Sequence, residues 1–66
     1  MITFQVDDMS CGHCVGVITR AVKDADRDAG VRIDLNKHLV EIEPKTSDAE
    51  QLRAAIAEAG YTPVAQ

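Results

Sequence analysis

The spacing of apolar residues switches between two periods along the 66-residue chain, and the order of these periods limits the folds that it can adopt. Apolar and polar residues alternate over 2–7, 31–35 and 39–43, which is typical of half-buried strands. Over 12–26 and 47–59 the apolar residues recur with the spacing of amphipathic helices. Residues 61–65 are predicted to form a short final strand, and Pro63 favours an edge position for it.

Residues that begin and end helices stand at the boundaries of these segments. Ser10 is the predicted N-cap of the first helix, and Gly30 follows its end. Ser47 and Glu50 have the spacing of a capping box, which predicts the start of the second helix. Gly60 is the predicted stop of that helix.

The resulting order is β-α-β-β-α-β. It predicts an α+β, ferredoxin-like fold in which a four-stranded antiparallel sheet carries two helices on one face. Two βαβ units fill residues 1–66, so we expect a single domain. Only 3% of the residues are aromatic, which predicts a mainly aliphatic core.

The charge of the chain argues against several classes of function. The net charge is −4, from 11 acidic and 7 basic residues. An acidic chain with few aromatic residues is poorly suited to bind nucleic acid.

No apolar stretch reaches the ~20 residues of a membrane span, and the N-terminus lacks the pattern of a secretory signal. We therefore expect a cytoplasmic protein that does not insert into a membrane, in a compartment where thiols stay reduced.

Both cysteines lie in the hexapeptide Met9-Ser10-Cys11-Gly12-His13-Cys14. Cys11 is expected in the loop after the first strand, and Cys14 in the first turn of the following helix. The positive end of a helix dipole favours thiolate over thiol, and the thiolate is the form that binds metal. Two soft sulfur ligands suit Cu(I), so these cysteines are predicted to bind one Cu(I) ion.

The small number of ligands argues against a closed metal site. Zinc sites and iron–sulfur clusters usually take four protein ligands, whereas the chain has two cysteines. His13 and His38 are the remaining candidates, and His38 is expected in a hairpin turn, beyond one helix and one strand. Two alternatives stay open. One is a dithiol redox protein, because CxxC at a helix start is also the thioredoxin arrangement. The other is a carrier of zinc, cadmium or mercury.

The Met9-x-Cys11-x-x-Cys14 motif after a strand, in a β-α-β-β-α-β chain of this length, resembles the heavy-metal-associated (HMA) domain family. The resemblance covers essentially the whole chain, and Gly60-Tyr61 is similar to bacterial copper chaperones of the CopZ type. It implies a protein that is not an enzyme and holds Cu(I) through Cys11 and Cys14. It also implies transfer by thiolate exchange to the metal-binding domain of a copper-transporting P-type ATPase, or to a copper-responsive regulator.

Further residues are candidates for a place around the metal. Met9 is predicted to be a core residue beneath the loop rather than a thioether ligand. His13 is expected to face solvent, with a metal-bridged dimer as the alternative to the monomer expected without metal. For Tyr61, shielding the metal and capping the sheet are equally favoured. Asp7 and Asp8 stand where many family members have glycine, and they add negative charge beside the site.

Overall fold

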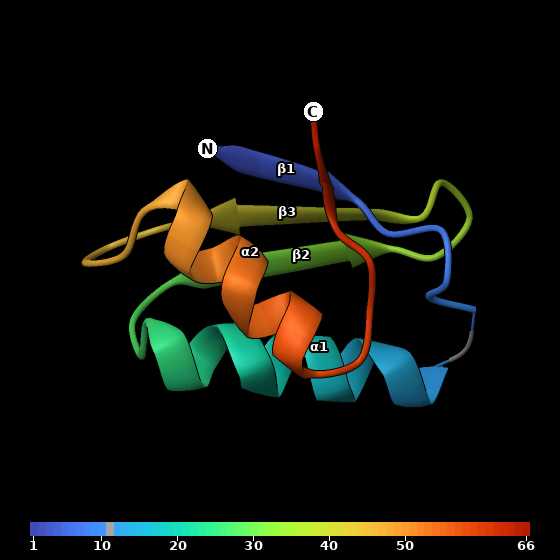
Figure 1. Ribbon diagram of the computed structural model, residues 1–66, viewed down its shortest axis with the longest axis horizontal. Helices are drawn as coiled ribbons and strands as arrows, with labels where there is room; N and C mark the ends of the chain where they lie inside the picture. The colour runs from blue at the N-terminus through green and yellow to red at the C-terminus, as the bar shows by residue number, and fades with distance from the viewer. Residues whose placement is uncertain (11) are drawn as a thin grey trace.

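The computed structural model describes residues 1–10 and 12–66. In these residues the elements are, in order, β1 (Ile2–Gln5), α1 (Gly12–Ala25), β2 (Gly30–Asp34), β3 (Leu39–Glu43), α2 (Ala49–Glu58) and β4 (Val64–Ala65). The strands form an antiparallel sheet of order β2-β3-β1-β4, and both helices lie on one side of it (Figure 1). The predicted ferredoxin-like arrangement is therefore confirmed.

The core lies between the sheet and the two helices. Val40 of β3 pairs with Phe4 of β1 and with Ile33 of β2, so apolar side chains from neighbouring strands share the face that the helices cover. The buried apolar side chains of the described residues are Phe4, Val6, Met9, Cys14, Ile18, Val22, Ala29, Val40, Ile42, Leu52 and Ile56. This core is largely aliphatic, as the composition predicts.

The strands β1 and β2 end earlier than predicted because a turn follows each of them. After β1, residues 6–9 form a turn in which the Met9 N–H donates to the Val6 carbonyl at 3.2 Å. After β2, the Asp34 carboxylate accepts the backbone N–H groups of Asn36 at 3.0 Å and Lys37 at 3.2 Å. These side-chain contacts fold 35–38 into the hairpin turn that precedes β3.

The last strand is also shorter than predicted, since β4 covers Val64–Ala65 rather than 61–65. It pairs with Phe4 and Gln5 of β1 at the edge of the sheet, directly after Pro63. Proline has no N–H to donate to a neighbouring strand, which agrees with its place outside the paired residues.

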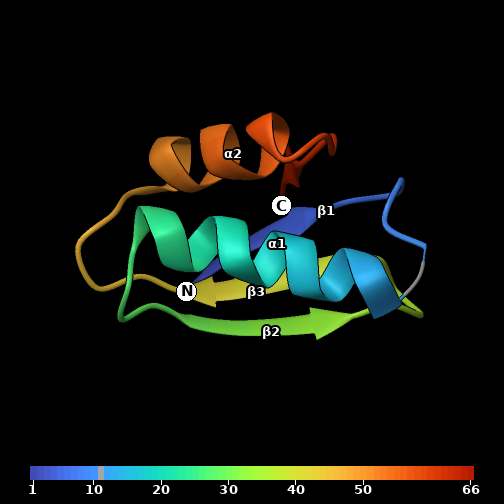
Figure 2. The ribbon, with the colours of Figure 1, turned by 90° about the horizontal axis from the view of Figure 1, so that it is seen from below.

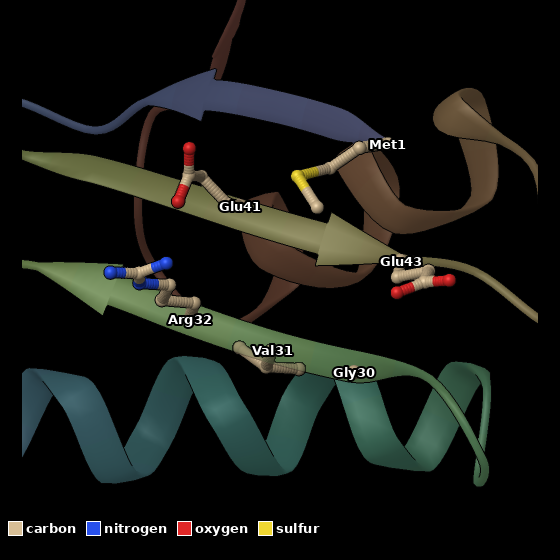
Figure 3. Close-up of a pocket in the computed structure, with 6 residues that line it drawn as sticks. All are labelled: Met1, Gly30, Val31, Arg32, Glu41 and Glu43. Atoms are coloured by element: carbon tan, nitrogen blue, oxygen red, sulfur yellow. The ribbon is translucent and has the colours of Figure 1, made fainter.

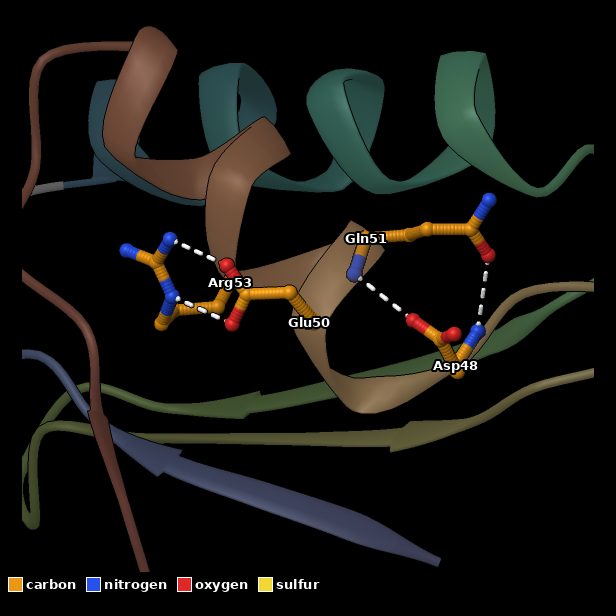
Figure 4. Close-up of polar contacts among 4 residues, drawn as sticks. All are labelled: Asp48, Glu50, Gln51 and Arg53. Atoms are coloured by element: carbon orange, nitrogen blue, oxygen red, sulfur yellow. Dashed lines mark hydrogen bonds and ion pairs between the residues drawn. The ribbon is translucent and has the colours of Figure 1, made fainter.

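The capping box of α2 lies one residue later than predicted. Asp48, not Ser47, is the N-cap (Figure 4): its carboxylate accepts the Gln51 N–H at 2.9 Å, and Gln51 Oε1 accepts the Asp48 N–H at 3.0 Å. The Ser47 hydroxyl instead donates to Asp26 at 2.7 Å. Glu50, the predicted partner of Ser47, forms an ion pair with the next turn of α2.

Asp26 is a buried carboxylate, 1% exposed, that joins the end of α1 to the connection between β3 and α2. It accepts the backbone N–H groups of Lys45, Thr46 and Ser47 at 2.8, 3.0 and 3.0 Å. The Thr46 and Ser47 hydroxyls also donate to it, at 3.2 and 2.7 Å. Burial by itself raises the pKa of Asp26, but these hydrogen bonds outweigh burial and hold the pKa far below its ordinary value. Asp26 is therefore charged at neutral pH.

Candidate metal centre

The cysteine hexapeptide begins in the loop after β1 and continues into the first turn of α1. Cys11, one of the two predicted metal ligands, lies outside the described residues. Gly12, His13 and Cys14 form the start of α1. The first N–H groups of a helix have no acceptor within it, and the helix dipole places partial positive charge at this end. The start of α1 is thus an environment that favours a thiolate.

Cys14 lies at the rim of the core. It is 8% exposed and belongs to the same buried cluster as Met9 and Ile18. Gly12 and His13, which precede it in α1, are exposed. Cys14 therefore marks the boundary between the packed interior and the exposed start of the helix.

Met9 and His13 occupy the environments that the sequence predicts. Met9 is fully buried and packs in the core, which fits a structural anchor beneath the loop. His13 is exposed on the first turn of α1. The burial of Met9 fixes one end of the segment that carries the cysteines.

Tyr61 is half-buried and packs against the core cluster. It follows Gly60, whose φ of +103° lies in the region where a side chain is strained. Thr62, the next residue, donates its backbone N–H and its hydroxyl to the Asp8 carboxylate, both at 3.2 Å. The segment that carries Tyr61 is therefore tied to the loop that leads to the cysteines.

The acidic pair before the hexapeptide has structural partners as well as charge. Asp8 accepts the hydrogen bonds from Thr62, while Asp7 accepts one from Gln5 Nε2 at 2.7 Å. From the sequence we expected only added negative charge at these positions. Asp8 and Thr62 are 54 positions apart, so no local spacing pattern indicates their contact.

His38 also contacts the loop, which sequence reasoning missed. It lies in the turn between β2 and β3, as predicted, but its ring Nδ1 is 2.7 Å from the Met9 carbonyl oxygen. Within residues 1–10 and 12–66, no three His, Cys, Asp or Glu side chains are grouped as metal ligands. The structure thus does not gather His13, His38 and Cys14 into one ligand set.

A shallow pocket of about 320 Å³ lies on the open face of the sheet (Figure 3). Its lining residues are Met1, Gly30, Val31, Arg32, Glu41 and Glu43. Arg32 and Glu41 are opposite each other in the β2–β3 register, so charges of opposite sign share this surface. The pocket contains neither thiol nor imidazole, and we assign no metal chemistry to it.

Comparison with known proteins agrees with this geometry. Residues 3–62 match the model of the heavy-metal-associated domain. The COP-associated protein of Helicobacter felis is 34% identical over 61 residues, which cover 91% of this chain and 92% of that protein.

No helix among the described residues has the length and apolar character needed to cross a membrane.

Two solved structures show the same fold at similar identity. A gold binding protein superposes with a TM-score of 0.93 at 35% identity and covers 100% of both chains. The copper chaperone Atx1 from Synechocystis PCC6803 superposes with a TM-score of 0.92 at 38% identity, over 97% of this chain and 100% of that one. The chain belongs to the heavy-metal-associated domain family.

Proposed function

We propose that the protein is a cytoplasmic copper chaperone that binds Cu(I) as cargo through Cys11 and Cys14. The observation that carries this proposal is the position of Cys14, the second cysteine of the CxxC motif, in the first turn of α1 in a domain of the heavy-metal-associated family. Thiolates are the ligands that Cu(I) prefers, and the helix start favours the thiolate form. The similarity to the Synechocystis copper chaperone supports copper as the metal.

We further propose that the ion leaves by thiolate exchange. Two ligands from this chain leave the ion open to a third, so a thiolate of the acceptor binds before one of this chain's sulfurs dissociates. The copper remains Cu(I) throughout, and no electron is transferred. The proposed acceptor is the metal-binding domain of a copper-transporting P-type ATPase, with a copper-responsive regulator as the alternative.

We also propose that residues 1–66 form one domain that is monomeric without metal. His13 is exposed beside Cys14 in sequence, so a metal-bridged dimer would bring the His13 side chains of two copies near the shared ion. Loading with Cu(I) during sedimentation measurements distinguishes a monomer from such a dimer.

Titration of the reduced protein with Cu(I), against a competing chelator, is expected to show about one tight site per chain, because soft thiolates favour this ion. A parallel titration measures zinc, and an excess of zinc is not expected to displace the copper. Preferential retention of zinc would contradict the copper assignment. Turnover in a disulfide-reduction assay would instead support the dithiol redox alternative.

Replacing Tyr61 by phenylalanine tests whether the hydroxyl acts on the metal. The ring and its packing against the core are kept, so we expect the free energy of unfolding to change by less than about 1 kcal/mol. If the hydroxyl shields the ion or contacts a ligand, Cu(I) affinity or transfer rate changes by roughly tenfold. If Cu(I) affinity and transfer rate were both unchanged, the hydroxyl would have no role at the metal, and Tyr61 would act only by packing against the core.

A further inference from the structure

His38 reaches from the β2–β3 turn to the loop that precedes the cysteines. Its φ is +55°, in the left-handed region that most side chains avoid but that Asn, Asp and His adopt more often. In this conformation the His38 carbonyl accepts the Val6 N–H at 2.8 Å. Its ring Nδ1 lies 2.7 Å from the Met9 carbonyl oxygen. One residue therefore makes a backbone contact and a side-chain contact to the same short segment.

These contacts lie at the two ends of a turn. Residues 6–9 are closed by the hydrogen bond from the Met9 N–H to the Val6 carbonyl, at 3.2 Å. His38 binds the first residue of this turn through its backbone and the last through its ring. Two contacts therefore hold Met9 in place. Its side chain is fully buried in the core, and its carbonyl oxygen contacts the His38 ring of the β2–β3 turn. Met9 is two positions before Cys11 in the sequence.

The contact between His38 and Met9 requires a particular protonation of the ring. A carbonyl oxygen only accepts hydrogen bonds, so Nδ1 of His38 must carry the hydrogen. In the neutral ring the hydrogen is then on Nδ1 and the lone pair on Nε2. This tautomer is a property of the protein without metal, and it can be measured directly.

We propose that His38 is a positioning residue for the metal loop. Its ring N–H holds the Met9 peptide, so the segment leading to Cys11 starts from one fixed orientation. Less ordering is then needed when the ion binds, and Cu(I) is bound more tightly and released more slowly. The strained φ of His38 fits a residue held in place for such a role. The part of the inference that concerns copper rests on the proposed function.

Three variants separate the ring contact from the backbone conformation. His38→Gly accepts the positive φ but has no side-chain donor. His38→Asn also tolerates this φ, and its amide places a donor near the position of Nδ1. Lys37→Ala is the matched control, because Lys37 is an exposed neighbour in the same turn and its backbone contacts do not depend on its side chain.

The affinity for Cu(I), measured by chelator competition, is expected to fall about tenfold in His38→Gly. His38→Asn and Lys37→Ala should remain within about threefold of the wild type, with the thermal stability of all variants recorded alongside. Wild-type affinity in His38→Gly would overturn the proposal. A loss in His38→Asn as large as in His38→Gly would also overturn it, because the donor would then be irrelevant.

Two measurements without metal keep the loop contact separate from copper binding. Nitrogen-15 NMR of the neutral imidazoles should show His38 with its hydrogen on Nδ1, and His13→Gln identifies which signals belong to His38. Exchange of the Met9 amide hydrogen should be faster in His38→Gly but not in His38→Asn. A hydrogen on Nε2, or unchanged exchange in His38→Gly, would overturn the proposal. If both results stood while the wild type lacked a tight Cu(I) site, the copper chaperone function would fail and the loop contact would not.

Discussion

Replacing Cys14 by serine is expected to remove the tight Cu(I) site. A serine hydroxyl stays protonated at neutral pH and offers a hard oxygen, whereas Cu(I) prefers soft thiolate. Loss of a direct ligand should lower the affinity by more than the roughly 100-fold seen when supporting contacts are lost. Chelator competition with the reduced protein measures this change. Cys11→Ser is expected to have the same effect, because each thiolate supplies one of two proposed ligands.

Stability must be measured in parallel, because Cys14 lies at the rim of the core and is 8% exposed. A serine hydroxyl at this position costs about 1–3 kcal/mol if it finds no partner. Cys14→Ala removes the thiol without adding a polar group, so it separates the loss of the ligand from a loss of stability. His13→Gln is the control for a change at an exposed neighbour and should retain the tight site. Tight binding that persists in Cys11→Ser and in Cys14→Ser would disprove the proposed ligands.

Replacing Asp26 by asparagine should give a large loss of stability, with a midpoint of thermal unfolding lower by roughly 10 °C at neutral pH. The carboxylate accepts hydrogen bonds from the backbone of 45–47 and from the Thr46 and Ser47 hydroxyls. The asparagine amide has one acceptor oxygen in place of two, and its NH2 group is itself a donor. Some of the N–H and hydroxyl groups that donate to Asp26 would therefore lose their acceptor. Thermal unfolding followed by circular dichroism measures the effect.

The same variant has a characteristic dependence on pH. The folded-state pKa of Asp26 is far below the value of 3.8 for an unperturbed aspartate. The carboxylate therefore contributes its full stability above the unfolded pKa and loses it progressively as the pH falls toward the folded pKa. The gap in unfolding midpoint between wild type and Asp26→Asn should narrow from about pH 5 downward. A gap that is independent of pH would show that the charge of Asp26 is not the cause.

Asp24→Asn is the matched control for Asp26. Asp24 lies on the exposed face of α1, with 76% of its side chain accessible, and its ion pair with Arg20 is at the surface. Such pairs contribute little, so the midpoint should hardly move. Asp26 directly follows the end of α1, and Cys14 lies at its start, so the length of the helix separates them (Figure 2). Folded Asp26→Asn should therefore bind Cu(I) as the wild type does.

The helices and strands of residues 1–10 and 12–66 could be predicted because the apolar residues that set the two periods face one shared core. The sequence did not predict where α2 begins, since Ser47 and Asp48 both have a suitable capping partner three residues later. The choice between them depends on Asp26, which binds Ser47 from 21 positions earlier in the chain. A contact between segments so far apart has no local signal.

In the candidate site, too, features with a local sequence signal could be predicted, whereas contacts between distant segments could not. The exposure of His13 follows from the helix period that surrounds it, and the burial of Met9 follows from the preference of methionine for the core. The contact of His38 with Met9 spans 29 positions and depends on a positive φ at a residue that is not glycine. A turn could be predicted around Asn36 and Lys37, but not the direction in which the His38 ring would point.

The place of β1 in the sheet has a consequence for how the protein opens. β1 lies between β3 and β4, and β4 pairs with Phe4 and Gln5, the residues of β1 nearest the loop. Amide groups in an interior strand exchange with solvent only through large-scale opening, while loops beyond it open at much lower free energy. Local opening of residues 6–10 can thus proceed without separating the strands. Under the proposed function, binding and release of the ion then require only local movement beside the sheet, at a free energy well below that of global unfolding.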